Sequence, residues 1–206
     1  MHITIIGTGN VGGALAENWA SKGHHIHLGV RDTSNFKGQH LLSVPNITVH
    51  TIGAAVILSE VILIAAAPQH TQSIVESMGD ISSKVMIDAM NSIRTRPDGY
   101  TNSFEALKSL TRGAEIVKCF NTTGYENMKD PIYHGEGIDV FMAGDSKKAK
   151  EIAKQLALDA GFSTCYDFGG DDKVALLEQF ALCWINLAIM QGQGRDIAFR
   201  VVRRQD

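Results

Sequence analysis

The first 32 residues constrain the fold of this chain more than any other stretch. An apolar run, Ile3 to Ile6, passes directly into the turn Gly7-Thr8-Gly9-Asn10-Val11-Gly12. A helical pattern follows, and a second apolar run from Ile26 to Val30 ends at the charged pair Arg31-Asp32. Strand, glycine turn, helix and strand in this order predict the first half of a dinucleotide-binding α/β fold.

Each glycine of the turn has a physical role in this prediction. Gly7 permits the tight turn, Gly9 lets the backbone approach a pyrophosphate, and Gly12 lets the helix pack closely on the strand. The helix that begins near Asn10 offers unpaired backbone amides and its positive dipole end to the phosphates. The predicted cofactor-binding residues of this turn are Gly7, Thr8, Gly9, Asn10, Val11 and Gly12.

The rest of the chain continues the alternation of strands and helices. Strands are predicted over 47–49, 61–66, 85–88, 115–120, 139–143 and 162–167, and helices over 33–42, 52–58, 70–78, 103–110, 146–159 and 171–190. Residues 121–137 show no clear period and are predicted as a long loop. We expect an α/β, Rossmann-type, doubly wound and mostly parallel sheet over residues 1–168, with a small C-terminal helical extension over 169–206.

Composition narrows the class of partner. The formal net charge of −3 gives no general attraction to nucleic acid or to anionic membranes. No signal peptide is evident, and the longest apolar stretch, 52–67, falls short of the roughly 20 residues that a membrane helix needs. Cys119, Cys165 and Cys183 are scattered, which favours buried thiols over a disulfide framework or a metal cluster. We expect a cytoplasmic protein that has a small-molecule substrate and no nucleic-acid, membrane or metal partner.

The end of the second strand indicates which dinucleotide binds. Asp32 lies about 20 residues beyond the glycine turn, where an NAD site usually places a carboxylate on the ribose. Arg31 precedes it, however, and an arginine at this place pairs with the 2′-phosphate of NADP. Thr8, Thr33, Ser34 and Lys37 offer further donors. The pattern favours NADP over NAD, and Asp32 would repel the phosphate if its carboxylate turned inward.

Several of these segments together resemble a known family. The glycine turn, Gly29-Val30-Arg31-Asp32, Val117-Lys118-Cys119-Phe120-Asn121-Thr122 and the ending Gly194-Arg195-Asp196-Ile197-Ala198-Phe199-Arg200 look like the NADP oxidoreductases that use the deazaflavin coenzyme F420. The reductase domains of the six-transmembrane metalloreductases are similar. The resemblance covers nearly the whole chain. The family often carries a serine where this chain has Val30, so one phosphate-binding hydroxyl is absent.

The resemblance also implies where the cofactor and the acceptor lie. Thr8 and Arg31 would contact the 2′-phosphate, and the nicotinamide end would be lined by Ala67, Pro68, Asn91, Phe120 and Asn121. The expected activity is hydride transfer between NADP(H) and coenzyme F420, or a flavin such as FMN or FAD. At the position of Asn121 the archaeal deazaflavin enzymes look histidine-like and the metalloreductases carry asparagine, which leaves the acceptor open.

The sequence assigns no catalytic acid or base, and hydride transfer between stacked rings requires none. His70 follows Pro68 after the fourth predicted strand and is the best single candidate for a proton relay, facing the nicotinamide side. A polar residue at a helix start is the more ordinary interpretation of His70. His134, in the long loop, has weaker grounds for reaching a substrate.

Two other functions stay open from the sequence. An imine or 3-hydroxy acid reductase, with a carbonyl or imine substrate, shares the amino-terminal pattern but usually has a longer helical carboxyl domain. A non-catalytic NADP(H)-binding redox sensor would fit the lack of a catalytic residue. The C-terminal helix, with Phe180 and Trp184 as anchors, is a candidate interface of a homodimer or a lid over the site.

Overall fold

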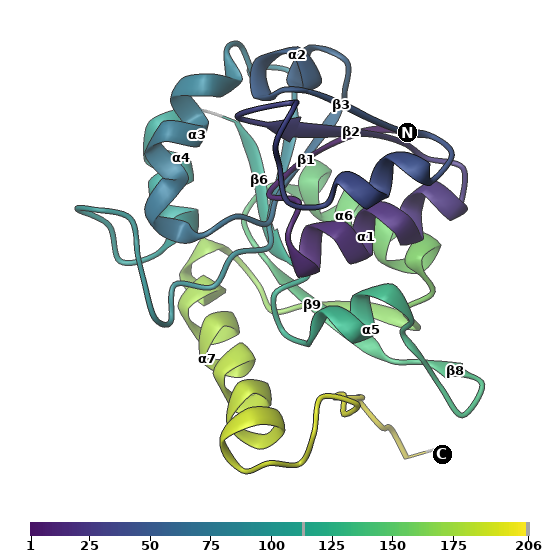
Figure 1. Ribbon diagram of the computed structural model, residues 1–206. Helices are drawn as coiled ribbons and strands as arrows, with labels where there is room; N and C mark the ends of the chain where they lie inside the picture. The colour runs from purple at the N-terminus through teal and green to yellow at the C-terminus, as the bar shows by residue number, and fades with distance from the viewer. Residues whose placement is uncertain (113, 205–206) are drawn as a thin grey trace.

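The computed structural model describes residues 1–112 and 114–204 of the chain. Within these residues, eight strands form one sheet in the order β10-β9-β6-β5-β4-β1-β2-β3 (Figure 1). Its strands are β1 (His2–Ile6), β2 (His25–Val30), β3 (Ile47–Thr51), β4 (Val61–Ile64), β5 (Val85–Asp88), β6 (Glu115–Cys119), β9 (Asp139–Ala143) and β10 (Thr164–Asp167). The chain winds outward from β1 in one direction and then, from β4, in the other, which confirms the predicted doubly wound sheet.

Helices cover both faces of the sheet. The α-helices are α1 (Asn10–Ser21), α2 (Ile52–Ile57), α3 (Thr71–Met78), α4 (Ser103–Thr111), α5 (Tyr125–Lys129), α6 (Lys147–Ala160) and α7 (Val174–Ile185). Short helices of other types are η1 (Gln39–Ser43), η2 (Pro68–His70), η3 (Asp171–Lys173) and the π-helix η4 (Asn186–Met190). The apolar sides of α1 and α6 build one core, and those of α2, α3, α4 and α7 build a second core on the opposite face.

The strand β9 departs from the parallel arrangement. It runs antiparallel to β6, with Lys118 opposite Ala143 and Cys119 opposite Met142, and β10 then pairs parallel to β9. The carboxyl ends of β9 and β10 therefore lie at the edge opposite those of β1 to β6. The carboxyl ends of the other six strands share one edge, which is where ligands bind in folds of this kind.

The helix predicted over 33–42 was wrong for its first half. Residues 33–38 form an irregular loop, and only η1 is helical. The Asp32 carboxylate accepts hydrogen bonds from the amide and the hydroxyl of Ser34, which favours a turn over a helix. Gly38 has a φ of 95°, a left-handed conformation that also interrupts a helix.

The long loop predicted over 121–137 was also wrong in part. It contains the short helix α5 and an antiparallel hairpin of β7 (Ile132–Tyr133) and β8 (Glu136–Gly137). The helix is one of five residues, and each hairpin strand has two, so no period was long enough to detect. His134 lies in the turn of the hairpin with a φ of 53°.

The C-terminal helix packs within its own chain. Phe180 contacts the rings of Phe141 and Phe199, and Trp184 is 3% exposed and donates a hydrogen bond to the Ile197 carbonyl at 2.7 Å. These two anchors proposed for a subunit interface are therefore used inside the chain. The segment 171–190 is long and apolar enough, by length and composition alone, to cross a membrane, a test that core helices also pass.

Candidate dinucleotide-binding site

The glycine turn between β1 and α1 is built by close contacts at its two ends. A Cβ atom on Gly7 would lie 2.5 Å from the backbone of Ala65, and one on Gly12 would lie 2.0 Å from the Gly7 carbonyl oxygen. Gly7 also has a φ of 100°. A Cβ on Gly9 would meet nothing within 4 Å. The outer glycines therefore allow the fold, while the middle one leaves open space for a ligand to approach the backbone.

The amino terminus of α1 opens into this space. Gly9 is its N-cap, no side chain caps the helix, and its first turn carries no acidic residue. The first amides of the helix therefore lack an intrahelical partner and their dipole end is uncompensated by a carboxylate. An anionic group such as a pyrophosphate satisfies both conditions. The phosphate-binding role of residues 7–12 stays a prediction, and this geometry leaves room for it.

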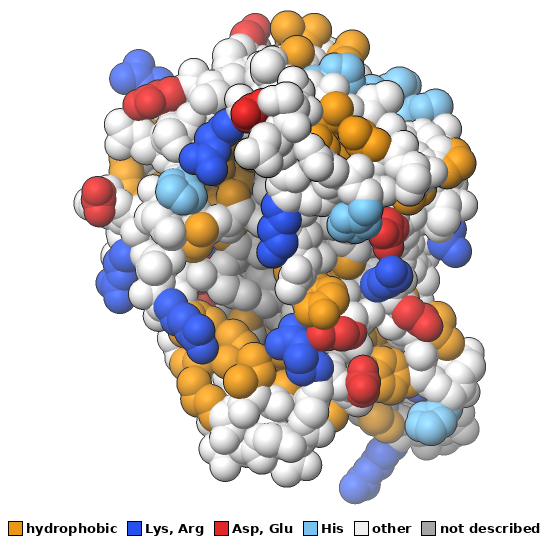
Figure 2. All heavy atoms as spheres, in the orientation of Figure 1, with side chains coloured by type: hydrophobic (Ala, Val, Ile, Leu, Met, Phe, Trp, Pro, Cys, Tyr) orange, Lys and Arg blue, Asp and Glu red, His pale blue; other side chains and the backbone are white. Residues whose placement is uncertain are grey.

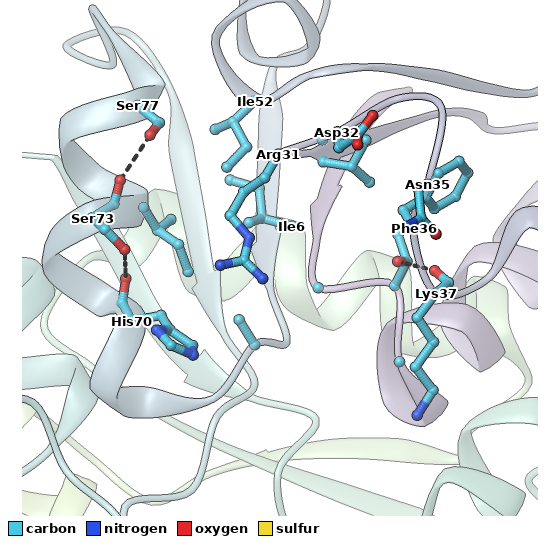
Figure 3. A pocket seen from close by; sticks show the side chains of 17 residues that line it. Ile6, Arg31, Asp32, Asn35, Phe36, Lys37, Ile52, His70, Ser73 and Ser77 are labelled. Atoms are coloured by element: carbon cyan, nitrogen blue, oxygen red, sulfur yellow. Dashed lines mark hydrogen bonds between the residues drawn. The ribbon is translucent and has the colours of Figure 1, made fainter.

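A pocket of about 620 Å³ extends from the turn along the carboxyl ends of β1, β2 and β4 (Figure 3). Its walls come from the turn itself, from the end of β2, from the loop after β2 and from α3. Figure 2 shows that this face is hollowed, with several Lys and Arg side chains around the hollow and hydrophobic side chains over α7 below it. The lining residues include Gly7, Thr8, Gly9, Arg31, Asp32, Asn35, Lys37, Ile52, His70, Ser73 and Ser77.

Arg31 and Asp32 point in different directions. The Arg31 guanidinium extends into the pocket toward α3, and it has no carboxylate partner among the residues that the structure describes (Figure 3). The Asp32 carboxylate instead accepts the amide of Ser34 at 2.8 Å and its hydroxyl at 2.6 Å. The hydrogen bonds from the Ser34 hydroxyl and amide hold the pKa of Asp32 below its ordinary value. The Asp32 carboxylate therefore does not turn into the pocket, where it would repel a phosphate.

The side of the pocket formed by α3 carries two serine hydroxyls that the sequence analysis did not single out. Ser73 and Ser77 lie on the face of α3 toward the pocket, in line with His70 at the end of η2 (Figure 3). The Ser73 hydroxyl donates to the His70 carbonyl at 3.0 Å, and the Ser77 hydroxyl donates to the Ser73 carbonyl at 2.8 Å. The i, i+3, i+7 spacing after Pro68 was the signal that could have found the two serines.

His70 itself lies elsewhere than predicted. It faces the pocket that holds Arg31 and the end of β2, where the adenosine half of a dinucleotide lies in this fold, whereas the prediction put it on the nicotinamide side. Its ring is exposed. A polar residue lining the cofactor pocket is therefore the better description of His70 than a proton relay.

The loop after β2 closes the opposite wall. The Thr8 hydroxyl donates a hydrogen bond to the Lys37 carbonyl, which ties the loop to the glycine turn. Gly38 packs so closely that a Cβ there would lie 2.8 Å from the Thr8 carbonyl oxygen. The Lys37 side chain extends along this wall (Figure 3). Thr8 and Lys37 thus line the same pocket as Arg31, but the Thr8 hydroxyl already donates its one proton to the Lys37 carbonyl, so the role of Thr8 as a phosphate donor stays a prediction.

The residues predicted for the nicotinamide end form a second group, at the carboxyl ends of β4, β5 and β6. Asn91 donates from Nδ2 to the Asn121 carbonyl at 2.7 Å, and Asn121 donates from Nδ2 to Asn91 Oδ1 at 3.0 Å. Ala67 is exposed and Pro68 is buried at the start of η2. In a doubly wound sheet this position continues the crevice past the glycine turn, away from Arg31.

Two residues predicted to line the cofactor or the substrate, Phe120 and His134, do not place their side chains at the Asn91–Asn121 pair. The ring of Phe120 is fully buried and packs edge-on against Trp19, with ring centroids 5.4 Å apart, so its side chain belongs to the core. His134 sits in the hairpin turn and is not among the residues that line the pocket of Arg31. Cys119 and Cys165 are buried as expected, but Cys183 is exposed.

A glycine turn, an uncapped helix end and an arginine in one pocket, at the carboxyl edge of a parallel sheet, define a dinucleotide-binding protein of the Rossmann type. Residues 2–92 match the family model described as NADP oxidoreductase, coenzyme F420-dependent. The match confirms, over this amino-terminal part of the chain, the family resemblance predicted from the sequence. It spans the glycine turn, Arg31, Pro68 and Asn91.

Comparison with known proteins extends the likeness beyond residue 92. The metalloreductase STEAP3 of Rattus norvegicus is 25% identical over 162 residues, which are 78% of this chain and 32% of that protein. The chain therefore spans about a third of the length of this curated relative.

Solved structures share the fold over nearly the whole chain. A protein of Arthrobacter sp. FB24, described as a candidate F420-dependent NADP reductase, superposes with a TM-score of 0.86 at 22% identity, covering 98% of this chain and 100% of that one. A reductive aminase of Aspergillus terreus in complex with NADPH and ethyl levulinate gives a TM-score of 0.68 at 20% identity, covering 92% of this chain and 62% of that one.

Proposed function

We propose that this protein is an NADP(H)-dependent reductase that exchanges hydride with a deazaflavin or flavin acceptor, at the carboxyl edge of the sheet. The observation that carries the proposal is the contrast between Arg31, whose guanidinium extends into the pocket without a carboxylate partner among the described residues, and Asp32, whose carboxylate is held by Ser34. A planar guanidinium pairs with a phosphate through two parallel hydrogen bonds, and an NAD site would instead need the carboxylate turned inward.

The residues present fit a 2′-phosphorylated dinucleotide along the whole crevice. Arg31, Thr8 and Lys37 would hold the 2′-phosphate end, the amides that begin α1 would hold the pyrophosphate, and Asn91 and Asn121 would flank the nicotinamide end. When bound, NADPH supplies the hydride. The protein's own contribution is to bind, to orient and to exclude water, so it needs no acid or base at the reacting carbon.

The other wall of the reaction site is proposed to come from the C-terminal extension, residues 169–206. Glu178 on α7 accepts a hydrogen bond from the Ser92 amide at 3.3 Å, which brings this helix directly beside Asn91. Hydrophobic side chains over α7 border the hollow in Figure 2. An apolar wall beside a polar pair suits a flat, conjugated ring as the acceptor.

Purified protein mixed with NADPH and coenzyme F420, FMN or FAD tests the proposal by absorbance. We expect oxidation of NADPH with at least one of these acceptors and a strong preference for NADPH over NADH. An Arg31→Ala variant should lose that preference, because its effect is confined to the phosphate. Absence of turnover with every flavin-type acceptor would overturn the acceptor assignment.

Imine reduction is the second candidate function. Its support is that the structural neighbours include the reductive aminase of Aspergillus terreus and an imine reductase of Bacillus cereus, at a TM-score of 0.68 each. This chain covers 62% of each of those proteins, so the rest of each has no counterpart here. Turnover with cyclic imines, and none with flavins, would place this function first.

A further inference from the structure

A fully buried lysine lies directly beneath the predicted nicotinamide end. Lys118 on β6 has a side chain that is 0% exposed, and its ammonium contacts Glu178 Oε1 at 2.7 Å, Asp88 Oδ2 at 3.0 Å and Ser103 Oγ at 3.3 Å. These three partners use all three donors of the ammonium. They come from β5, α4 and α7, so a single side chain joins four elements behind the crevice.

Burial of this ion cluster is not explained by stability. Moving charges out of water costs several kcal/mol per ion, and well-packed apolar residues of similar volume often replace such clusters without loss. Lys118 follows the apolar residues Ile116 and Val117 in β6, so the charge stands inside a buried strand. A cluster of this kind is better explained by what it holds in place.

Both carboxylates of the cluster hold the turn that carries Asn91. Asp88 Oδ1 accepts the Met90 amide at 2.9 Å, and Glu178 Oε1 accepts the Ser92 amide at 3.3 Å. The backbone on each side of Asn91 is therefore fixed by a carboxylate that Lys118 holds. Ser92 adds a third tie, since its hydroxyl oxygen accepts the Ser103 amide at 2.9 Å.

The orientation of the two asparagines follows from the backbone. The Asn121 carbonyl can only accept, so Asn91 must direct Nδ2 toward it and Oδ1 toward the Asn121 side chain. Asn121 must then donate from Nδ2, which leaves its own Oδ1 buried with no partner among the described residues. Such an acceptor costs about 1–3 kcal/mol. The neighbouring Phe120 has a φ of 61°, a second local cost.

An unpaired buried acceptor and a positive φ persist in a folded protein only where surrounding contacts hold them in place. We propose that Lys118 is a positioning residue for the nicotinamide end of the cofactor. Through Asp88 and Glu178 it fixes the turn of Asn91, and through Asn91 it fixes Asn121. The inference rests on the proposed function, because it takes the Asn91–Asn121 pair as the boundary of the nicotinamide site.

Two ligands separate this role from a general structural one. NADPH fills both halves of the crevice, whereas adenosine 2′,5′-bisphosphate reaches only the half that holds Arg31. A Lys118→Met variant should weaken NADPH about tenfold and leave the bisphosphate within about twofold, both by calorimetry. The fluorescence lifetime of bound NADPH, which reports immobilisation of the nicotinamide ring, should fall in the same variant.

Two further variants keep the test decisive. Glu178→Gln retains an acceptor for the Ser92 amide and removes one charge, so it should show the same selective loss, to a smaller degree, even where Lys118→Met does not fold. Lys150→Met is the matched control, since Lys150 binds Asp167 at 2.8 Å and the Gly169 carbonyl at 2.8 Å, remote from Asn91. It should change neither ligand.

The outcomes distinguish this inference from the cofactor assignment. Equal weakening of both ligands, or no change in either ligand in folded Lys118→Met and Glu178→Gln, would overturn the positioning role. Failure of the unaltered protein to bind NADPH and the bisphosphate would instead overturn the proposed NADP site itself.

Discussion

Substitution of single glycines separates ligand binding from folding in the turn between β1 and α1. In Gly9→Ala the new methyl group meets no protein atom within 4 Å, so the folded chain can accept it. Two opposing effects on the free energy of unfolding nearly cancel. Alanine is a poorer N-cap than glycine, but it also restricts the unfolded chain, by about 0.4–1 kcal/mol. We expect the free energy of unfolding to stay within about 1 kcal/mol of the original.

Binding should respond very differently to the same methyl group. It occupies the space through which a pyrophosphate approaches the Gly9 backbone and would displace at least one charge-assisted hydrogen bond. Such a bond contributes about 1.5–3 kcal/mol, which corresponds to about 10- to 150-fold in Kd. Calorimetric titration with NADPH, together with urea unfolding of the free protein, measures both quantities.

Gly12→Ala is the contrasting variant. Its methyl group would lie 2.0 Å from the Gly7 carbonyl oxygen, so backbone must move. We expect a loss of unfolding free energy of about 1–3 kcal/mol or more. Unchanged NADPH affinity in Gly9→Ala, or a loss of stability as large as that of Gly12→Ala, would refute the division of roles among the three glycines.

Three further predictions concern charge, pH and the C-terminal helix. Arg31→Ala should weaken NADPH by about 10- to 150-fold and leave NADH unchanged in steady-state kinetics. Burial lowers the pKa of His27 from 6.5 to about 4, so the unfolded chain alone takes up this proton between those values. Stability should therefore fall by about 1.4 kcal/mol per pH unit below pH 6.5, and His27→Gln should remove this contribution in urea unfolding at pH 7 and pH 5. Gly124→Ala would place a methyl group 2.7 Å from the Trp184 ring, and unchanged tryptophan fluorescence and melting temperature would contradict the packing described.

The parts of the fold that depend on local pattern could be predicted from the sequence. Residues 1–32 contain the glycine turn, the helical period and the start of the helix within one short segment. The structure has the predicted strand, helix and strand there. The direction of β9 could not be predicted, because its four apolar residues after Asp139 look the same in a parallel and an antiparallel pair. The loop after Asp32 depends on the contact between Thr8 and Lys37, which are 29 residues apart.

The candidate site also has one half that could be predicted from the sequence and one half that could not. The phosphate-binding half follows from one contiguous motif, whereas the Lys118 cluster joins residues 30 and 60 positions apart, which no local period connects. One sign was available. A lysine between Val117 and Cys119, inside a strand whose other central residues are apolar, requires a buried partner. Phe120 stood beside it in the motif, and only the packing of its ring on Trp19 shows that it belongs to the core.

The reversed direction of β9 has a practical consequence for attaching the protein to a solid support. Because β9 ends at the edge opposite the glycine turn, α6 begins there, and Lys147 and Lys148 are exposed in its first turn. Amine coupling through these two lysines would orient the crevice toward the solution. A cofactor regenerated in a flow cell or at an electrode would then reach Arg31 unobstructed.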